Sequence, residues 1–578
     1  MKKNIILAAA LVAMLPLHAQ KEDDVYNESV LVKGSYRPTI ELGEKISFPA
    51  MITDTMTRME HTFGYDITPV RMKSLYRPSR IKAARIIGEP ATKLYNNYIR
   101  LGMGNYWTPM ADLYWSSLRD KKKTYGVRMN HLSSWGKLPD YGKNHYGVTG
   151  ITLFGKYIVK DLLQLSSDLS YEHDHNLYYG FSDDTLAARM PGKSRSDINT
   201  SDIRAKYNIV TWNIGLRNME LDANKLGYGA NLRLSDIWGS WGQNEFNLNL
   251  SGDIRYGFNI QHKYKGVAYL RAEWDGYSHR YRPEGEMPLG YIPAPITDTL
   301  RGSRNIVKFN PYADFMFNGL QFHAGFTMGW DGFSDGNDVT PRFFPDVVVS
   351  KSVLNDAMVL SVGLTGGFDA NNWNVIRHIN PYITPNAEQR ATRHYDFAGH
   401  MRWTISKKIE ANAEISFSRL NDDLTFILDT NYALDNVFNT RYFGDDRLTI
   451  GGDIAFVNDE MLTLRAGGHL YSHTLTGGEK ILSYRPKWDV LVAADVNYND
   501  KWLFHLETQL LGKMDDDQGE SLPMRYGINA QVEYRHNKAL SFFLKMDNLA
   551  FQRYYYWRNY PSQRGLFILG LTYTMPHK

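Results

Sequence analysis

The chain has 578 residues, no cysteine, 38 tyrosines and a formal net charge of +4. So small a charge gives no reason to expect a nucleic-acid partner, and the missing cysteine excludes disulfides, thiol catalysis and lipidation of a mature N-terminus. Beyond the first twenty residues no run of about 18 apolar residues occurs, so we expect no transmembrane helix.

The first residues have the pattern of a secretory signal peptide. Lys2 and Lys3 form a charged start, residues 5–17 form an apolar core, and Ala19 precedes the expected cleavage point. We therefore expect residues 1–19 to be removed on export.

Residues 20–92 differ from the rest of the chain. Three acidic residues, Glu22 to Asp24, open a polar stretch, and prolines interrupt the later residues 48–90 at positions 49, 69, 78 and 90. Prolines at this density argue against a regular domain. We expect a short periplasmic extension or a segment inside a larger structure. A basic run could meet acidic walls there, or could simply be solvated: Arg77, Arg80, Lys82 and Arg85.

From residue 93 onwards, apolar and polar residues alternate. Between Phe246 and Gln261 one face is apolar along its whole length, and the other carries asparagine, serine, aspartate and arginine. A period of two indicates an extended strand, and this one is far longer than the usual 5–6 residues. Similar segments recur at 98–103, 112–117, 124–133, 147–158, 163–173, 203–209, 212–216, 228–234, 267–274, 320–330, 409–418, 462–470, 488–498, 502–510 and 525–535.

This repetition predicts an all-β fold, a transmembrane antiparallel β-barrel over residues 93–578 with lipid outside and water inside. Roughly 485 residues at about 20–24 per strand and connection favour 22 strands within a range of 16–24. An alternative is 16–18 longer strands. Export together with this pattern places the protein in a bacterial-type outer membrane. We expect extracellular loops near 182–194, 283–304 and 331–341.

Charged residues recur on the polar face, which would line the lumen. They either pair and stiffen the wall, or they form a hydrated path or docking surface. The predicted lumen-facing residues are Arg204, Arg217, Arg233, Asp253, Arg255, Arg465, Glu507, Arg525, Glu533, Arg535 and Lys545.

Three other groups contain residue types that occur in metal sites or catalytic sites. His173 and His175 share a strand face but have no evident third metal ligand, and the acidic loops 331–338 (Asp331, Asp335, Asn337, Asp338) and 515–520 lack calcium-loop spacing. Ser472, His473 and Asp453 have the residue types of a catalytic triad. However, Ser472 and His473 are adjacent on a predicted strand, so their side chains would point to opposite faces. We therefore predict no metal, no cofactor and no enzymatic activity.

The end of the chain resembles the end of TonB-dependent outer-membrane receptors. Those barrels finish with a strand, an Asn-Leu turn, a tyrosine-rich loop, a Tyr-Pro with a nearby arginine, and a closing strand. The matching residues are Asn548, Leu549, Tyr554, Tyr560, Pro561, Arg564 and Tyr573. The resemblance covers about 35 residues. The usual final aromatic residue is missing, and Met575 stands near its place.

A second, weaker resemblance lies near the N-terminus. The residues Glu28, Ser29, Val30, Leu31 and Val32 resemble the short segment by which such receptors pair with TonB. An exposed β-prone stretch on a tether suits strand addition, although it can also be an ordinary strand-former. The resemblance implies a plug of about 150 residues in a barrel this wide, yet only about 70 residues precede the barrel here. Another element should then fill the lumen: the N-terminal segment, inward-folded loops, or a partner.

These observations predict a transport-class barrel in outer-membrane lipid, similar to TonB-dependent receptors, that binds or moves a solute. The candidate partners are TonB and a periplasmic or lipoprotein partner. The alternative is a structural barrel that acts as a scaffold for such a lipoprotein or periplasmic protein.

Overall fold

The computed structural model describes residues 97–575, apart from 118–119, 121, 161, 220–225, 261–263, 283–299, 334–339, 459–460 and 479. The expected signal peptide, the segment 20–92 and the TonB-pairing stretch lie outside these residues. Within the described part, no helix has both the length and the apolar character needed to cross a bilayer.

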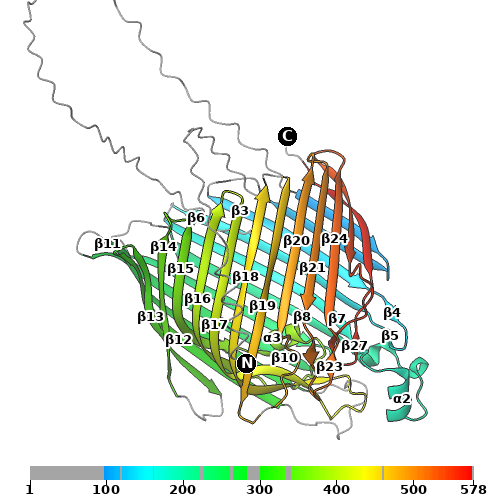
Figure 1. The fold of residues 1–578 in the computed structure, drawn as a ribbon. Helices are drawn as coiled ribbons and strands as arrows, with labels where there is room; N and C mark the ends of the chain where they lie inside the picture. Colours follow the sequence, from blue (N-terminus) through cyan, green and yellow to red (C-terminus); the bar gives the residue numbers. More distant parts are fainter. Residues whose placement is uncertain are drawn as a thin grey trace, which may run out of the picture. The chain divides into compact units, whose positions relative to one another are not determined.

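One sheet of 22 strands makes up most of the structure (Figure 1). Its strands are β1 (Asn97–Gly104), β2 (Thr108–Ser116), β3 (Lys123–Ser134), β6 (Tyr146–Val159), β7 (Leu163–Leu177), β8 (Arg204–Asn218), β9 (Gly227–Gly239), β10 (Gln243–Ile260), β11 (Tyr264–Tyr281), β12 (Leu300–Phe317), β13 (Leu320–Phe333), β14 (Arg342–Val353), β15 (Met358–Ala370), β16 (Ala391–Ser406), β17 (Ile409–Leu428), β18 (Phe438–Asn458), β19 (Leu462–Thr476), β20 (Trp488–Tyr498), β21 (Trp502–Leu511), β24 (Arg525–Arg535), β25 (Leu540–Asp547) and β28 (Leu566–Tyr573).

Each strand pairs antiparallel with its sequence neighbours, and β1 pairs with β28, so the sheet closes into a barrel. The connections alternate in length. Those at one end are short, such as residues 318–319 between β12 and β13, whereas most at the other end are longer, such as 371–390 between β15 and β16. The predicted closed antiparallel barrel of about 22 strands is confirmed.

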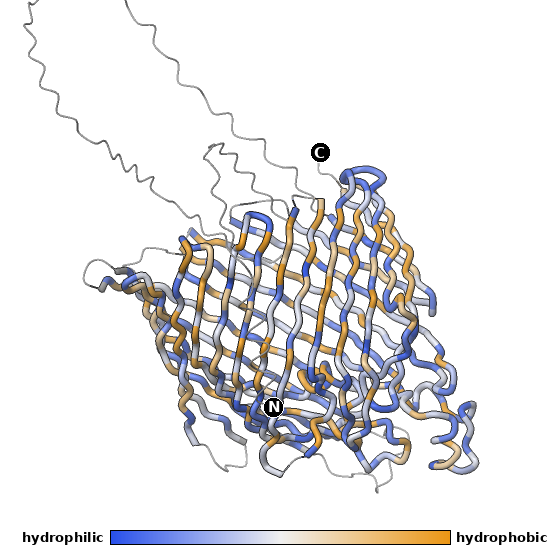
Figure 2. The backbone as a smooth tube through the Cα atoms, viewed as in Figure 1, coloured by the Kyte–Doolittle hydropathy of each residue, from blue (hydrophilic) through white to orange (hydrophobic). Residues whose placement is uncertain are grey.

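The two faces of the barrel wall differ in polarity, as the alternating colours along the strands in Figure 2 show. On β10, Phe246, Leu250 and Ile254 are each about half exposed on the outer face. Glu245 lies on the other face and contacts the connection 371–390, which identifies that face as the lumen side. The period of two seen in the sequence therefore separates an apolar exterior from a polar interior.

Most of the predicted strand segments agree with the structure to within a few residues, and 488–498 and 525–535 agree at both ends. The two segments 203–209 and 212–216 are wrong as separate strands. They form the single strand β8, which runs without interruption from Arg204 to Asn218.

The longer connections carry the remaining elements. These are β4 (Lys137–Leu138), β5 (Gly142–Lys143), α2 (Asp183–Arg189), the 3-10 helices η1 (Arg195–Asp197) and η2 (Thr200–Ile203), α3 (Trp373–Ile379), β22 (Met514–Asp515), β23 (Ser521–Leu522), β26 (Tyr555–Trp557) and β27 (Tyr560–Pro561). Apolar residues of these connections and of the adjoining strand ends pack into one buried cluster that includes Tyr178, Trp373, Ile383, Phe438 and Tyr560. We call this end of the barrel, where the long connections meet, the mouth.

A charge placed on the outer face should disrupt the barrel, because the sequence predicts that this face meets lipid. Val492 lies on the outer face of β20 with 46% of its surface exposed. We expect Val492→Arg to cost about 2–4 kcal/mol near the membrane midplane and to reduce assembly, measured as loss of the heat-modifiable folded band in gel electrophoresis. Asp495→Arg changes the lumen face of the same strand and should be tolerated. Equal folding of the two variants would contradict the assignment of faces.

Candidate functional site

The connection between β15 and β16, residues 371–390, lies across the mouth. Near its start, the side chain of Asn372 caps α3 by accepting a hydrogen bond from Val375 N at 2.9 Å. Asn176 on β7 donates to Pro381 O at 2.9 Å from the other side of the barrel. Eight strands, β8 to β15, lie between β7 and β16 in the sheet. A segment that touches both sides must therefore span the opening.

Two charged side chains from the wall hold this connection. Glu245 on β10 is fully buried and accepts hydrogen bonds from Trp373 N at 2.7 Å and Asn374 N at 3.2 Å. Its carboxylate thus pairs two backbone N–H groups at the start of α3, where the helix dipole favours a negative charge. At the other end of α3, Arg377 forms an ion pair with Asp174 on β7. The short helix is fixed between two walls.

Aromatic rings seal the space beyond α3. Tyr382 stacks on Tyr560 with 3.4 Å between ring centroids, and Tyr179 meets Tyr560 edge-on at 5.1 Å. The phenol of Tyr560 donates to Asn436 O at 2.5 Å. Gly180 lies so close to the Tyr560 ring that a Cβ there would approach it to 2.4 Å. Connections far apart in the sequence are thereby joined into one closure.

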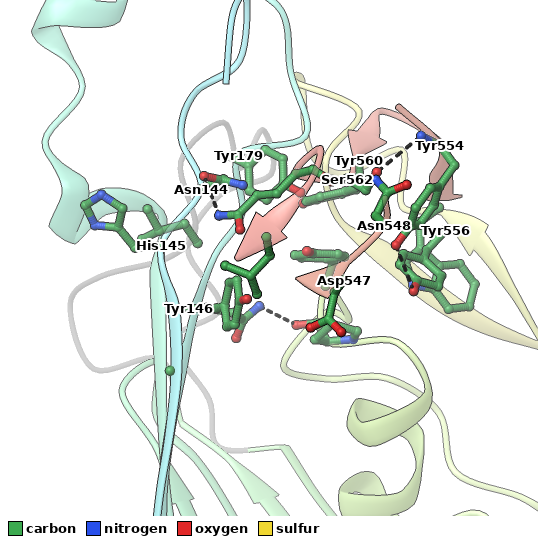
Figure 3. Close-up of a pocket in the computed structure, with 18 of the residues that line it drawn as sticks. Asn144, His145, Tyr146, Tyr179, Asp547, Asn548, Tyr554, Tyr556, Tyr560 and Ser562 are labelled. Atoms are coloured by element: carbon green, nitrogen blue, oxygen red, sulfur yellow. Dashed lines mark hydrogen bonds between the residues drawn. The ribbon is translucent and has the colours of Figure 1, made fainter. Parts of the chain in front are cut away.

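A cavity of about 750 Å³ lies beside this closure. It is bounded by the start of β6, the end of β7, the connection 371–390, strands β21 and β24, and the connection between β25 and β28. Figure 3 shows Asn144, His145 and Tyr146 on one side and Asn548, Tyr554 and Tyr556 on the other. Its volume and its mixture of aromatic and polar side chains are typical of a small-molecule site.

Four residues of the C-terminal motif line this cavity: Asn548, Tyr554, Tyr560 and Arg564. Asn548 has a positive φ of 55° and closes the turn after β25, because its Nδ2 donates to Gln552 O and its Oδ1 accepts from Gln552 N. Asparagine tolerates the left-handed region better than most residues, which explains this position of the motif. Leu549, Pro561 and Tyr573 are not among the lining residues.

Arg525 at the start of β24 is fixed against the cavity wall. Its guanidinium carbon lies 4.7 Å from the ring centroid of Tyr554 and 4.3 Å from that of Tyr556. Its Nη2 donates to Gln509 Oε1 at 3.4 Å. The two tyrosine hydroxyls are 3.3 Å apart. Cation–π contacts of this kind hold the arginine in place without neutralising its charge.

Four ionisable groups in the connections around the cavity, three tyrosines and one histidine, are neutral near pH 7. Burial raises the pKa of the Tyr179, Tyr382 and Tyr560 phenols, so these remain hydrogen-bond donors. Burial lowers the pKa of His145, whose imidazole is therefore uncharged at neutral pH. The charge of the cavity is then carried by carboxylates and guanidinium groups.

Ten of the eleven predicted lumen-facing charged residues lie on the lumen side. Their strand registers connect them to the face of Glu245, as in the pairs Arg233–Asn249 and Lys545–Gln531. Arg204 is the exception. It is thirteen residues from Arg217 on β8, and an odd separation on one continuous strand puts the two on opposite faces.

The charges on the lumen side make local contacts. Arg217, Asp253 and Arg255 line a second cavity of about 610 Å³ on the inner wall. Lys545 pairs with Asp547 at 3.1 Å, Ser541 donates to Glu533 at 2.6 Å, and Arg255 donates to Asn218 O at 3.3 Å. These contacts join the same or nearby strands. Whether these residues form a path for a solute remains a prediction.

The residues considered as metal or catalytic candidates take part in structural contacts. His173 bonds to Asn208, Asp331 pairs with Arg304, and Asp516 pairs with Arg558 at 2.9 Å. Asp335, Asn337 and Asp338 lie outside the described residues. His473 bonds to Asp445, and not to Asp453. In the described part of the chain, no three histidine or acidic side chains gather as a metal site would require.

No local sequence pattern predicts the element that closes the mouth, residues 371–390. Its helix α3 is only seven residues long, and its stability depends on Glu245 and Asp174 from distant strands. One sequence signal was present: Asn372 precedes an apolar-periodic stretch, as an N-cap does.

No protein-family model and no curated protein sequence matches this chain. Solved structures do match its fold. The ferric-catecholate import receptor Fiu of Escherichia coli K12 superposes with a TM-score of 0.60 at 10% identity, covering 84% of this chain and 82% of that chain. The siderophore receptor PirA of Acinetobacter baumannii gives 0.61 at 10%, covering 84% and 81%. The pyoverdine receptor FpvA of Pseudomonas aeruginosa gives 0.61 at 10%, covering 84% and 79%.

This similarity confirms the predicted likeness to receptors of the TonB-dependent type at the level of the barrel fold. At 10% identity it extends to the fold alone. What those receptors bind is a property of those proteins.

Removing the carboxylate of Glu245 should loosen α3. In Glu245→Ala, the buried N–H of Trp373 and the partly buried N–H of Asn374 lose their acceptor, at about 1–3 kcal/mol for the buried group. We expect the amides of residues 373–376 to exchange hydrogen about tenfold faster or more, measured by mass spectrometry. Glu388→Ala, which removes a half-exposed carboxylate from the same connection, should change nothing. If these amides exchanged as slowly in Glu245→Ala as in the wild type, the connection would be held in place without this contact.

Proposed function

We propose that this chain is an outer-membrane protein of the transport class, which binds a solute in the cavity at the mouth and passes it through the lumen when residues 371–390 move aside. The observation that carries the proposal is that this connection spans the opening and also forms part of the cavity wall. The barrel similarity supports an outer-membrane location and a transport class.

The cavity and the closure share residues, which links binding to opening. Asp174 lines the cavity and pairs with Arg377 on α3, while Tyr382 lines the cavity and stacks on Tyr560. A solute that contacts either residue competes with a contact that holds the closure. It can favour the open state only by the difference between its affinities for the two states.

In this proposal TonB binds the stretch from Glu28 to Val32 from the periplasm, by adding a β-strand to it. Energy from such a partner would supply the work of moving the closure. The alternative of a scaffold barrel needs no opening, and this difference separates the two functions.

An engineered disulfide tests the opening directly, because the chain has no cysteine of its own. Ile383 and Phe438 face each other in a parallel β-bridge, and neighbouring strands lie about 4.8 Å apart, within the range a disulfide spans. In planar bilayers we expect the oxidised Ile383→Cys/Phe438→Cys protein to open at least tenfold less often than the same protein after reduction.

Each single cysteine variant serves as the control, since neither can form the bond and neither should respond to reductant. Equal currents from the oxidised and reduced double variant would contradict a gating role for residues 371–390. A barrel that carries no current in either state and co-purifies with a lipoprotein would support the scaffold alternative.

A further inference from the structure

The acidic and basic side chains that line the cavity at the mouth differ in whether they form ion pairs. Its carboxylates both have cationic partners, since Asp174 pairs with Arg377 and Asp547 pairs with Lys545 at 3.1 Å. Across the described residues, no carboxylate lies within ion-pair distance of Arg525 or Arg564, which also line the cavity. The charge left available to a ligand is therefore positive.

The hydrogen-bonding groups around Arg525 are mainly donors. Its Nε is buried and has no acceptor among the described residues. Gln509 uses its carbonyl oxygen to accept from Arg525, and Asn529 uses its own to accept from Asn548 N at 3.0 Å. Their NH₂ groups are then left for a ligand. An unpaired buried N–H is costly, so a ligand rich in acceptors is favoured.

The rings of the cavity restrict the ligand further. Tyr554 and Tyr556 meet edge to face at 5.0 Å, and Trp557 also lines the cavity. Such rings offer flat apolar surfaces beside polar tips, which suits a ring compound with C–H faces and hydroxyl groups at its edge. The tyrosine hydroxyls both donate and accept, as sugar hydroxyls do.

Resting on the proposed function of this cavity as the solute site, we infer that its ligand is an anionic saccharide. Its acid group binds Arg525 and Arg564, and a sugar ring packs against the tyrosines. Guanidinium groups bind carboxylate and sulfate through two parallel hydrogen bonds, and Arg525 is already fixed in orientation by its two tyrosines.

An array of neutral, carboxylated and sulfated oligosaccharides, probed with the purified full chain in detergent, tests this inference. We expect binding to acidic saccharides, with at least tenfold weaker binding of neutral ones of the same size. The carboxylated and sulfated members distinguish the two sources of the acid group. Arg525→Gln should reduce binding of the acidic members about tenfold or more, as expected for a charge-assisted hydrogen bond.

Arg535→Gln is the matched control. Arg535 lies on the same strand and the same face, but at the end of β24 away from the mouth, and does not line the cavity. It should bind as the wild type does, and heat-modifiable mobility should show that both variants fold. Binding of neutral saccharides alone, no binding, or preference for a ferric catecholate added as a competitor would each overturn the inference.

The two proposals can fail separately. If the array shows no saccharide binding while the disulfide still controls the current, the ligand class is wrong and the transport function stands. If acidic saccharides bind while the current is the same with and without the disulfide, the cavity is a binding site on a barrel that residues 371–390 do not gate.

Discussion

The whole structure depends on the pairing of β1 with β28. That pairing gives each barrel strand a hydrogen-bonded neighbour on both sides, so the sheet has no free edge. In lipid an unpaired N–H or C=O costs several kcal/mol, and only a closed ring of strands avoids that cost along the sheet. Once the ring of strands is closed, the alternation of apolar and polar residues along each strand determines which side chains face outwards and which face the lumen. Apolar side chains face outwards, and the polar ones enclose a space that something must fill.

Part of that space is filled by the chain's own long connections, and electrostatics explains why they stay in place. Burying the carboxylate of Glu245 is unfavourable unless its oxygens are paired, and α3 supplies two N–H groups. Burying Arg377 is similarly unfavourable without Asp174. Each wall residue would lose its partner if the connection left. The closure is therefore stable as a unit, and opening it requires that water, a ligand or a partner replace these contacts.

The fold was largely predictable from the sequence because a barrel repeats a local rule. Strands such as β20 and β24 follow from alternation alone. The predicted lumen position of Arg204 is wrong for a related reason. The alternation predicts two strands where the structure has the single strand β8. Only on one continuous strand does the odd separation of Arg204 and Arg217 put them on opposite faces. Only part of the cavity wall can be predicted from the sequence. Its C-terminal wall carries the recognised motif, whereas Asn144, Tyr146 and Tyr382 reach it through long-range packing that no local pattern encodes.

The strands differ greatly in length around the barrel. β28, β1 and β2 have 8, 8 and 9 residues, whereas β17 and β18 have 20 and 21. At a rise of about 3.3 Å per residue and a tilt of about 40°, eight residues span roughly 20 Å, less than the apolar band of about 25 Å typical of such barrels. The bilayer therefore has to thin beside the short strands, or the barrel axis has to lean towards them. Hydrophobic mismatch on one side alone would give the molecule a preferred orientation in the membrane and a preference for thin regions of it.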